Sequence, residues 1–234
     1  RSSFSLYQNI RSNGLIAYKC APGDKLLSVT KAEPTQEVLI STRQGIAMRC
    51  PGSEFRPLGR NTTGVRGIKM REGHAIASMI VLDPDEQRKL LTISEKGYGK
   101  RTSLSEYRLQ KRGGFGIFDI KTDDRNGSAV GSILVDDEDK IMLLTNKGQL
   151  IKIPVKNIRA TGRNTKGVRL MNVSKGELIV SVTRVIESED DGLEEHIPED
   201  TEEGSADFAQ ESTVDSEVAS ADEATVSEAD ETKE

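Results

Sequence analysis

The sequence has 234 residues and a formal net charge of -5; 35% of the residues are hydrophobic, 4% are aromatic and none is Trp. This composition is lean for one large core, but it suits stacked repeats, whose small local cores need fewer large side chains. No run of about 18 apolar residues occurs, and the N-terminal RSSFSLYQNI has no apolar centre. We therefore expect a cytoplasmic protein with neither a membrane span nor a signal peptide.

Two parts of opposite charge meet at about residue 187. Residues 187–234 hold 20 Asp and Glu against one Lys, which leaves 18 acidic and 32 basic residues in 1–186, a balance of +14. A basic body of this kind favours a polyanionic partner. Because residues 187–234 cannot bury enough apolar surface to offset their chain entropy, we predict a disordered acidic tail that competes with the polyanion for the body.

The body is an array of repeats. Gly45, Gly97 and Gly148 are separated by 52 and then 51 residues, and a second glycine series at 64, 116 and 167 keeps the same intervals. The stretch RNTTGVRGIKM at 60–70 returns as RNTKGVRLM at 163–171. Two independent landmarks with one period indicate an internal repeat of about 50 residues.

Each repeat is expected to contain four strands. The first two form hairpins at 38–49, 90–102 and 141–153, where the Gly in each turn adopts positive φ at no steric cost. A third strand follows the glycine of the repeated loop, and a fourth strand follows it after a short turn. The expected third strands are 14–19, 64–69, 116–121 and 167–172, and the fourth strands are 23–29, 73–79, 127–133 and 176–182.

Four strands in about 50 residues are typical of a propeller blade. We therefore predict an all-β, propeller-like fold over 1–186, with a partial blade at about 1–33 and full blades at about 34–85, 86–136 and 137–186. A closed propeller usually has four to eight blades, so we expect the C-terminal fragment of a longer chain.

Several of these stretches resemble one family. RNTTGVRGI, the KGYGKRT hairpin, VDDEDKIMLLTNKGQLIKI and GRNTKGV are similar to the C-terminal domain of DNA gyrase A. The resemblance implies a β-pinwheel, a propeller-like disc whose blades exchange a strand, and a domain that wraps duplex DNA around its basic rim. It also implies a type IIA topoisomerase, a heterotetramer of gyrase A and gyrase B that introduces negative supercoils with ATP and Mg²⁺, and no cofactor in this segment.

Basic residues recur at equivalent places in the repeats, which would form a positive arc for the phosphate backbone. Any one of these charges can also be read as a solvated loop residue. The candidate DNA contacts are Arg43, Lys96 and Lys147 at the hairpin turns, Arg49, Lys100, Arg101 and Lys152 on the second strands, and Arg56, Arg60, Arg66, Lys111, Arg112, Arg159, Arg163, Lys166 and Arg169 around the repeated loop.

Two features of the loops allow more than one interpretation. Asn61 and Asn164 either bond phosphates or close the loop through their own side chains. Residues 110–116, QKRGGFG, resemble the box that the family uses for wrapping, but Phe115 stands where the box has a basic residue. We interpret 110–116 as a degenerate copy that contacts DNA through Lys111 and Arg112.

Catalysis finds little support in the sequence. Only two His are present, no zinc or Ser-His-Asp motif occurs, and the acidic run at 136–139 is read as a solvated turn, so we predict no catalytic or metal site and no cutting of DNA by this segment alone. The alternatives are the C-terminal domain of topoisomerase IV, which serves decatenation, a protein-binding β-propeller scaffold and a propeller enzyme. The absence of Trp argues against a WD40-type scaffold.

Overall fold

The computed structural model describes residues 1–10 and 12–186, so the predicted acidic tail at 187–234 lies outside the described residues. Within this part of the chain the regular structure consists of β-strands and short 3-10 helices. The strands are β1 Glu37–Thr42, β2 Ile46–Pro51, β3 Ile76–Leu82, β4 Lys89–Ser94, β5 Tyr98–Ser103, β6 Ile117–Phe118, β7 Ala129–Val135, β8 Lys140–Thr145, β9 Leu150–Pro154, β10 Val168–Arg169 and β11 Ile179–Val185. The 3-10 helices are η1 Phe4–Tyr7, η2 Gly52–Glu54, η3 Leu104–Glu106 and η4 Val155–Asn157.

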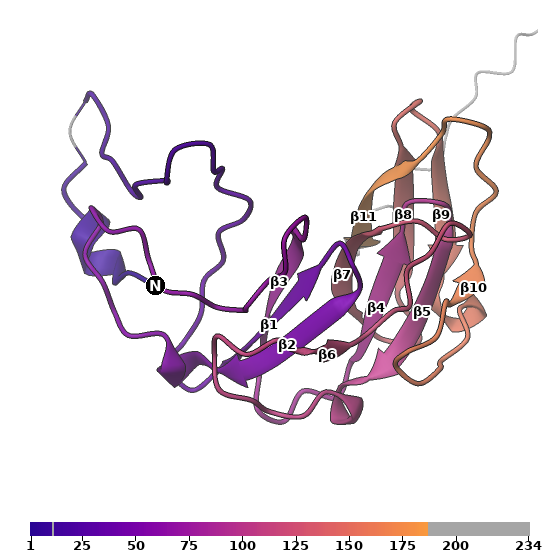
Figure 1. The fold of residues 1–234 in the computed structure, drawn as a ribbon, viewed down its shortest axis with the longest axis horizontal. Coiled ribbons are helices and arrows are strands. Elements are labelled where there is room, and N and C mark those ends of the chain that lie inside the picture. The colour runs from indigo at the N-terminus through magenta and orange to yellow at the C-terminus, as the bar shows by residue number, and fades with distance from the viewer. Residues whose placement is uncertain (11, 187–234) are drawn as a thin grey trace, which may run out of the picture. The chain divides into compact units, whose positions relative to one another are not determined.

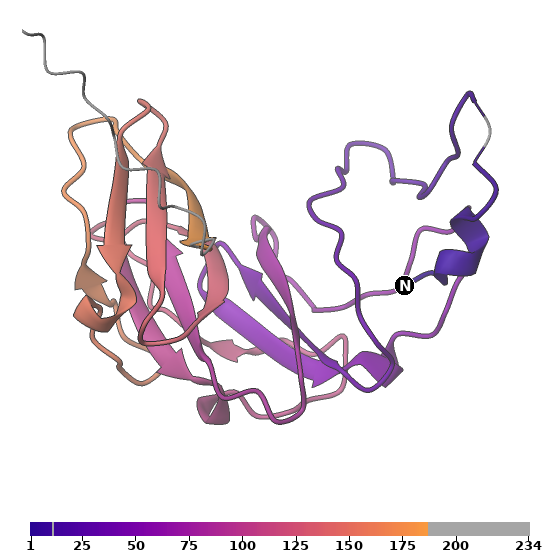
Figure 2. The ribbon, with the colours of Figure 1, turned by 180° about the vertical axis from the view of Figure 1, so that it is seen from behind.

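The strands form three antiparallel sheets, one after another along the chain (Figures 1 and 2). Their strand orders are β3-β1-β2-β6, β10-β5-β4-β7 and β11-β8-β9. The three predicted hairpins are confirmed as β1–β2, β4–β5 and β8–β9, and Gly45, Gly97 and Gly148 in their turns have φ of 75°, 84° and 84°. The predicted all-β blade architecture is therefore confirmed.

The sheets exchange their outer strands. β6 follows the second hairpin in the sequence but pairs with β2 of the first sheet, where Phe118 lies opposite Ile46. In the same way β10 pairs with β5 of the second sheet, where Arg169 lies opposite Tyr98. Each of these two sheets therefore holds three strands of its own repeat and takes its fourth strand from the next repeat, as the family resemblance implied.

This exchange explains where the strand predictions were wrong. The third sheet has three strands among the described residues, because no described repeat follows it to supply an outer strand. Residues 64–69 form no strand, since their partner would be a hairpin ahead of the first described one. Residues 1–10 and 12–33 contain η1 and no strand, so the strands predicted at 14–19 and 23–29 are wrong for the described residues.

Hydroxyl groups join the first two sheets where the fourth strands β3 and β7 pack together. Ser41 and Ser78 share a hydrogen bond of 2.6 Å, and the backbone N–H of Ser132 donates to the Ser78 hydroxyl at 3.0 Å. Ser132 in turn bonds Thr92 at 3.1 Å. Ser78 and Ser132, each five residues after a glycine, therefore bond each other across the blade junction instead of facing water.

Cys20 and Cys50 are both free thiols, and they differ in burial: Cys20 is exposed and Cys50 is fully buried. Burial raises the pKa of the Cys50 thiol to about 11. Because only the thiolate reacts, we predict that iodoacetamide at pH 8 modifies Cys20 rapidly and Cys50 only after urea unfolds the chain. Mass spectrometry of the two peptides checks this, and fast native modification of Cys50 would contradict the packing of the first sheet.

Candidate nucleic-acid interface

Three of the predicted cations lie at the hairpin turns, and the turns are tied to the next repeat. The Arg43 carbonyl accepts a hydrogen bond from the Ala129 N–H at 2.7 Å, and the Glu95 carbonyl accepts the equivalent bond from Ile179 at 2.8 Å. These bonds bring the turns of successive sheets to one end of the array. The cations at that end are Arg43, Lys96 and Lys147, as predicted from the period.

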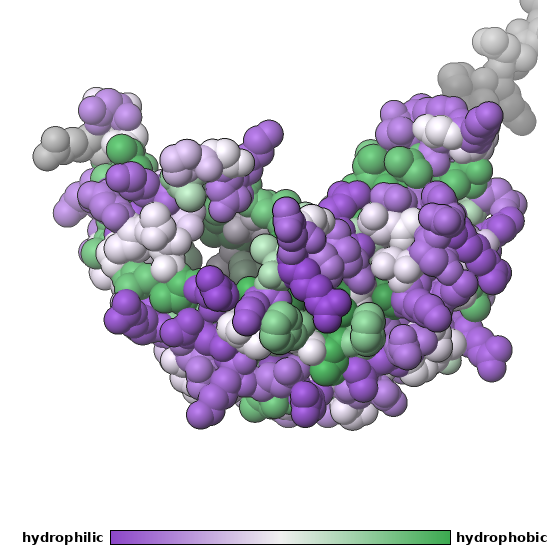
Figure 3. Space-filling view, viewed as in Figure 1, coloured by the Kyte–Doolittle hydropathy of each residue, from purple (hydrophilic) through white to green (hydrophobic). Residues whose placement is uncertain are grey.

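Four other predicted cations are exposed and have no side-chain partner among the described residues. They lie in the repeated loops, on all three repeats. Hydrophilic residues also cover most of the face shown in Figure 3, with smaller hydrophobic patches between them. A surface of this kind suits a hydrated, charged partner. The four residues are Arg56, Arg66, Lys111 and Arg159, and Lys152 on β9 is also exposed.

Two of the cations that we predicted to contact DNA, Lys100 and Arg101, are buried in the structure. Lys100 is fully buried and its ammonium lies 3.4 Å from the Asp119 carboxylate. Arg101 is 7% exposed, donates to the Ile158 carbonyl at 2.6 Å and is ion-paired with Asp137. Both sheet faces are covered at β5, so these cations point into protein and we withdraw them from the DNA-contacting set.

Arg49 has a similar structural role to Arg101, one repeat earlier. Its Nε pairs with Glu37 at 2.5 Å, and one terminal nitrogen donates to the Leu104 carbonyl at 3.0 Å. Of its side chain 15% is exposed. A guanidinium held between its own hairpin and the next repeat positions the sheets and leaves little surface for a phosphate.

The arginine four residues before each loop glycine forms a clasp between repeats. In each case one terminal nitrogen donates to the carbonyl of the residue two after the preceding loop glycine. Arg60 bonds Ile16 at 3.0 Å, Arg112 bonds Arg66 at 3.2 Å and Arg163 bonds Phe118 at 3.1 Å. The recurrence of this arginine in the sequence therefore has a structural cause, which sets it apart from the exposed cations.

The clasp can be separated from a DNA contact by a charge-conserving substitution. We predict that Arg163→Lys lowers the free energy of unfolding by about 1 kcal/mol, because Lys keeps the charge but loses the bond to the Phe118 carbonyl. The matched control Arg159→Lys, at an exposed residue, is expected to leave the stability unchanged. Urea unfolding measures both variants, and equal stabilities would contradict the clasp.

The box-like stretch at 110–116 holds one arginine that bonds other parts of the protein and one lysine that is exposed to a binding partner. Arg112 donates to the Glu54 carbonyl at 2.8 Å in addition to its clasp bond, so it is committed to the protein, whereas Lys111 is exposed. Phe115 is 55% exposed and Lys69 lies over its ring at 4.6 Å. The stretch therefore offers Lys111 to a binding partner, and the rest of it holds the loop.

The remaining predicted cations are engaged at the surface. Arg43 is ion-paired with Glu95 at 3.2 Å and Lys166 with Asp123, whereas Lys147 and Lys96 donate to the backbone carbonyls of Lys175 and Asp124. Surface ion pairs contribute little to stability, and all four cations can exchange these partners for a phosphate. These four cations therefore remain predicted DNA contacts.

One cationic cluster was missed by the sequence analysis. Arg125, from the loop before β7, and Arg169, on the exchanged strand β10, both bond the hydroxyl of Tyr98. Arg169 lies 71 residues from Tyr98 in the chain, and strand exchange brings the two together. No local signal separates Arg125 from other loop arginines.

The acidic run at 136–139 forms a hydrogen-bonded turn, in which the Asp136 N–H donates to Asp139 at 2.8 Å. Asp137 is ion-paired with Lys89 and Arg101, and Asp139 with Arg184. In residues 1–10 and 12–186 no group of three or more His, Cys, Asp and Glu is placed to hold a metal ion, and no helix is long and apolar enough to cross a membrane.

The fold and the surface define a class: a β-propeller that exchanges outer strands between blades and presents exposed cations on each repeat. The model of the DNA gyrase C-terminal domain, a β-propeller, matches residues 36–83, 88–136 and 139–186. The chain belongs to the DNA gyrase C-terminal domain family.

Relatives and solved structures agree. DNA gyrase A of Escherichia coli (strain K12) is 38% identical over 211 residues, which are 90% of this chain and 24% of the relative. DNA gyrase A of Staphylococcus epidermidis (strain ATCC 12228) is 39% identical over 81% of this chain and 21% of the relative, so the chain spans less than a quarter of these proteins. A structure of the DNA gyrase A C-terminal domain aligns with a TM-score of 0.67 at 28% identity, over 74% of this chain and 59% of that one.

A topoisomerase IV C-terminal domain aligns with a TM-score of 0.73 at 22% identity, over 79% of this chain and 57% of that one. At this identity the likeness shows the fold alone.

Proposed function

We propose that this chain binds duplex DNA and wraps it along its basic surface as part of DNA gyrase A. The observation that supports the proposal is the presence of exposed cations on every repeat of a body with a balance of +14, in a chain of this family. Affinity would come from counterion release along the phosphate backbone and not from base contacts. Bending would favour deformable sequences.

The same proposal extends to the complete enzyme. There the wrapped DNA supports negative supercoiling by a cytoplasmic heterotetramer with gyrase B, which supplies ATP hydrolysis with Mg²⁺. This segment itself takes no cofactor and cuts no DNA. The acidic tail at 187–234 competes with DNA for the basic surface.

Binding of a fluorescent 40-base-pair duplex, measured by anisotropy between 50 and 250 mM salt, tests the proposal. We expect the logarithm of the affinity to fall linearly with the logarithm of salt, and residues 1–186 to bind more tightly than 1–234. Arg66→Gln with Arg159→Gln should reduce the slope by about 2, since each lost phosphate contact removes about 0.9. Lys19→Gln with Lys25→Gln, an equal loss of charge where no strand forms, is the control. No binding at 50 mM salt, or binding that ignores salt, contradicts the proposal.

The alternative is the C-terminal domain of topoisomerase IV, which the fold similarity to that domain keeps open. A wrapping assay separates the two. Relaxed circular DNA is nicked and resealed in the presence of the chain, and its linking number is compared with a control without protein. A change of constant sign that grows with protein concentration supports gyrase-type wrapping, whereas binding without a change favours the alternative.

A further inference from the structure

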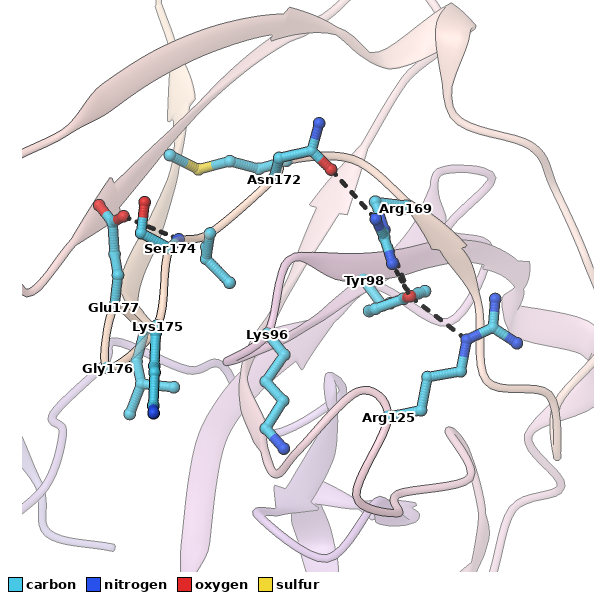
Figure 4. Close-up of a pocket in the computed structure, with 12 residues that line it drawn as sticks. Lys96, Tyr98, Arg125, Arg169, Asn172, Ser174, Lys175, Gly176 and Glu177 are labelled. Carbon is cyan, nitrogen blue, oxygen red and sulfur yellow. Dashed lines mark hydrogen bonds between the residues drawn. The ribbon is translucent and has the colours of Figure 1, made fainter.

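A cavity of about 330 Å³ lies beside the turn of the second hairpin (Figure 4). Tyr98 and Arg125 form one side of it, and residues 173–178 of the last repeat form the other side. Figure 4 shows Lys96 between the two sides, with Ser174, Lys175 and Glu177 along the opposite loop. The cavity therefore lies where two successive repeats meet.

Two guanidinium groups converge on one phenol in this cavity. The Tyr98 hydroxyl accepts from Arg125 Nε at 3.2 Å and from Arg169 Nη2 at 2.6 Å and Nε at 3.2 Å. Both groups also lie over the ring, with their central carbons 5.1 and 5.2 Å from its centroid. Tyr98 itself is 2% exposed, so the cations are held against a fixed neutral group.

The lining carries more positive than negative charge. Lys96 and Lys175 add two ammonium groups, and Glu177 is the acid among the lining residues. Its carboxylate is occupied, because it accepts from the Thr145 hydroxyl at 2.7 Å and from the Ser174 N–H at 3.1 Å. Hydrogen bonds from Arg125 and then Arg169 lower the pKa of Tyr98, as expected in a positive potential.

Asp123, the acid two residues before Arg125, is also engaged by other groups. Asp123 accepts from the Arg125 backbone N–H at 3.0 Å and is ion-paired with Lys166. The two terminal nitrogens of Arg125 and the ammonium of Lys175 have no hydrogen-bond partner in the part of the chain that the structure describes. The cavity therefore presents free donors of positive charge to which an anion can bind.

We propose that this Tyr98 pocket (Lys96, Tyr98, Arg125, Arg169 and Lys175) binds a backbone phosphate of duplex DNA and fixes the position of the wrap on the second blade. The proposal rests on the proposed function. A planar guanidinium binds phosphate through two parallel bonds, and a guanidinium already held by Tyr98 loses less side-chain entropy on binding than a free one. Tyr98 acts as a positioning residue, because it orients the two arginines and carries no charge.

A phosphate within a duplex fits the surroundings better than a free one. Arg125, Arg169 and Lys175 are exposed, so a chain of phosphates can pass over them. On one side of the pocket Lys147 donates to the Lys175 carbonyl. On the other side Lys96 lines the same surface hollow as Arg43 at the turn of the first hairpin. The cations therefore extend beyond the pocket in both directions. A free anion would use the pocket alone.

Three variants of the full chain test the pocket with the 40-base-pair duplex and the salt titration above. Tyr98→Phe keeps every charge and nearly the same shape, and we expect it to weaken binding about threefold. Arg125→Gln with Arg169→Gln is expected to weaken binding at least tenfold at 100 mM salt and to lower the salt slope by about 2. Lys19→Gln with Lys25→Gln, an equal loss of charge at exposed residues outside the pocket and outside the predicted DNA contacts, is the control, with an expected loss below threefold. Urea unfolding verifies that each variant is folded.

The outcomes separate this inference from the proposed function. If the wild type binds DNA and the double variant binds no worse than two control substitutions, the pocket is not a phosphate site and wrapping stands. If Tyr98→Phe binds like the wild type, the positioning role is overturned. If the wild type ignores DNA but is stabilised against urea by millimolar pyrophosphate, and the double variant is not, the pocket takes a free phosphate and the DNA site is overturned.

Discussion

Asp119→Ala is expected to lower the free energy of unfolding by about 3–5 kcal/mol, because it strands a buried cation. Asp119 follows the exchanged strand β6 of the first sheet, but its carboxylate lies in the second sheet. There it accepts from the Tyr107 hydroxyl at 2.5 Å and from Thr92 at 2.8 Å, and it faces the fully buried Lys100 ammonium at 3.4 Å. One side chain therefore joins two blades. Urea unfolding at pH 7 measures the loss.

The cause of this loss can be checked in two ways. Adding Lys100→Met should recover most of the stability, since no uncompensated charge then remains. Burial lowers the pKa of Lys100, and the pKa should fall further without Asp119. Between the folded-state pKa of Lys100 and its unfolded value of about 10.4, the unfolded chain binds more protons than the folded chain. The stability of Asp119→Ala should therefore rise as the pH is raised from 7 toward about 10.4. A loss that is unchanged by pH and by Lys100→Met would show that the ion pair is not responsible.

The blade architecture was predictable because it depends on local signals. The glycines of the hairpin turns and the apolar runs beside them repeat at one period, and each hairpin forms where that period places it. The exchanged strands are shorter than the six-residue run from Gly116 predicts. Beyond Phe118 the Asp119 N–H still bonds the Gly45 carbonyl of the first hairpin, and the Lys121 N–H then bonds the Thr165 carbonyl of the next repeat. A run that passes between sheets has no sequence signature of its own.

The charged surface was predictable as a whole and unpredictable residue by residue. Arg159 and Arg163 are the same residue type in the same loop, yet only Arg163 reaches a main-chain carbonyl of the preceding repeat. A carbonyl partner leaves no mark on the sequence, because every residue has one. The prediction that Lys100 contacts DNA was wrong for a related reason, because the amino-acid sequence does not show that β5 is covered on both faces. The period thus locates the cations, and only the fold shows which of them are free.

The hairpin glycines offer a test of strand exchange itself. Gly97 and Gly148 share φ of 84°, a conformation that costs Ala about 1–2 kcal/mol. They differ in their surroundings. A Cβ at Gly97 would overlap the carbonyl oxygen of Met171, just beyond the exchanged strand β10. Nothing lies within 4 Å of a Cβ at Gly148, because the third sheet has no exchanged strand among the described residues.

We therefore predict that Gly148→Ala costs only the conformational strain, and that Gly97→Ala costs about 1–3 kcal/mol more, because the added methyl displaces the exchanged strand. Gly45→Ala should behave like Gly97→Ala, since a Cβ there would overlap the Ile120 carbonyl beside β6. Urea unfolding of the three variants in the full chain makes the comparison. Equal losses at Gly97 and Gly148 would mean that β10 does not pack against the second hairpin, and the Tyr98 pocket, which depends on that packing through Arg169, would fall with it.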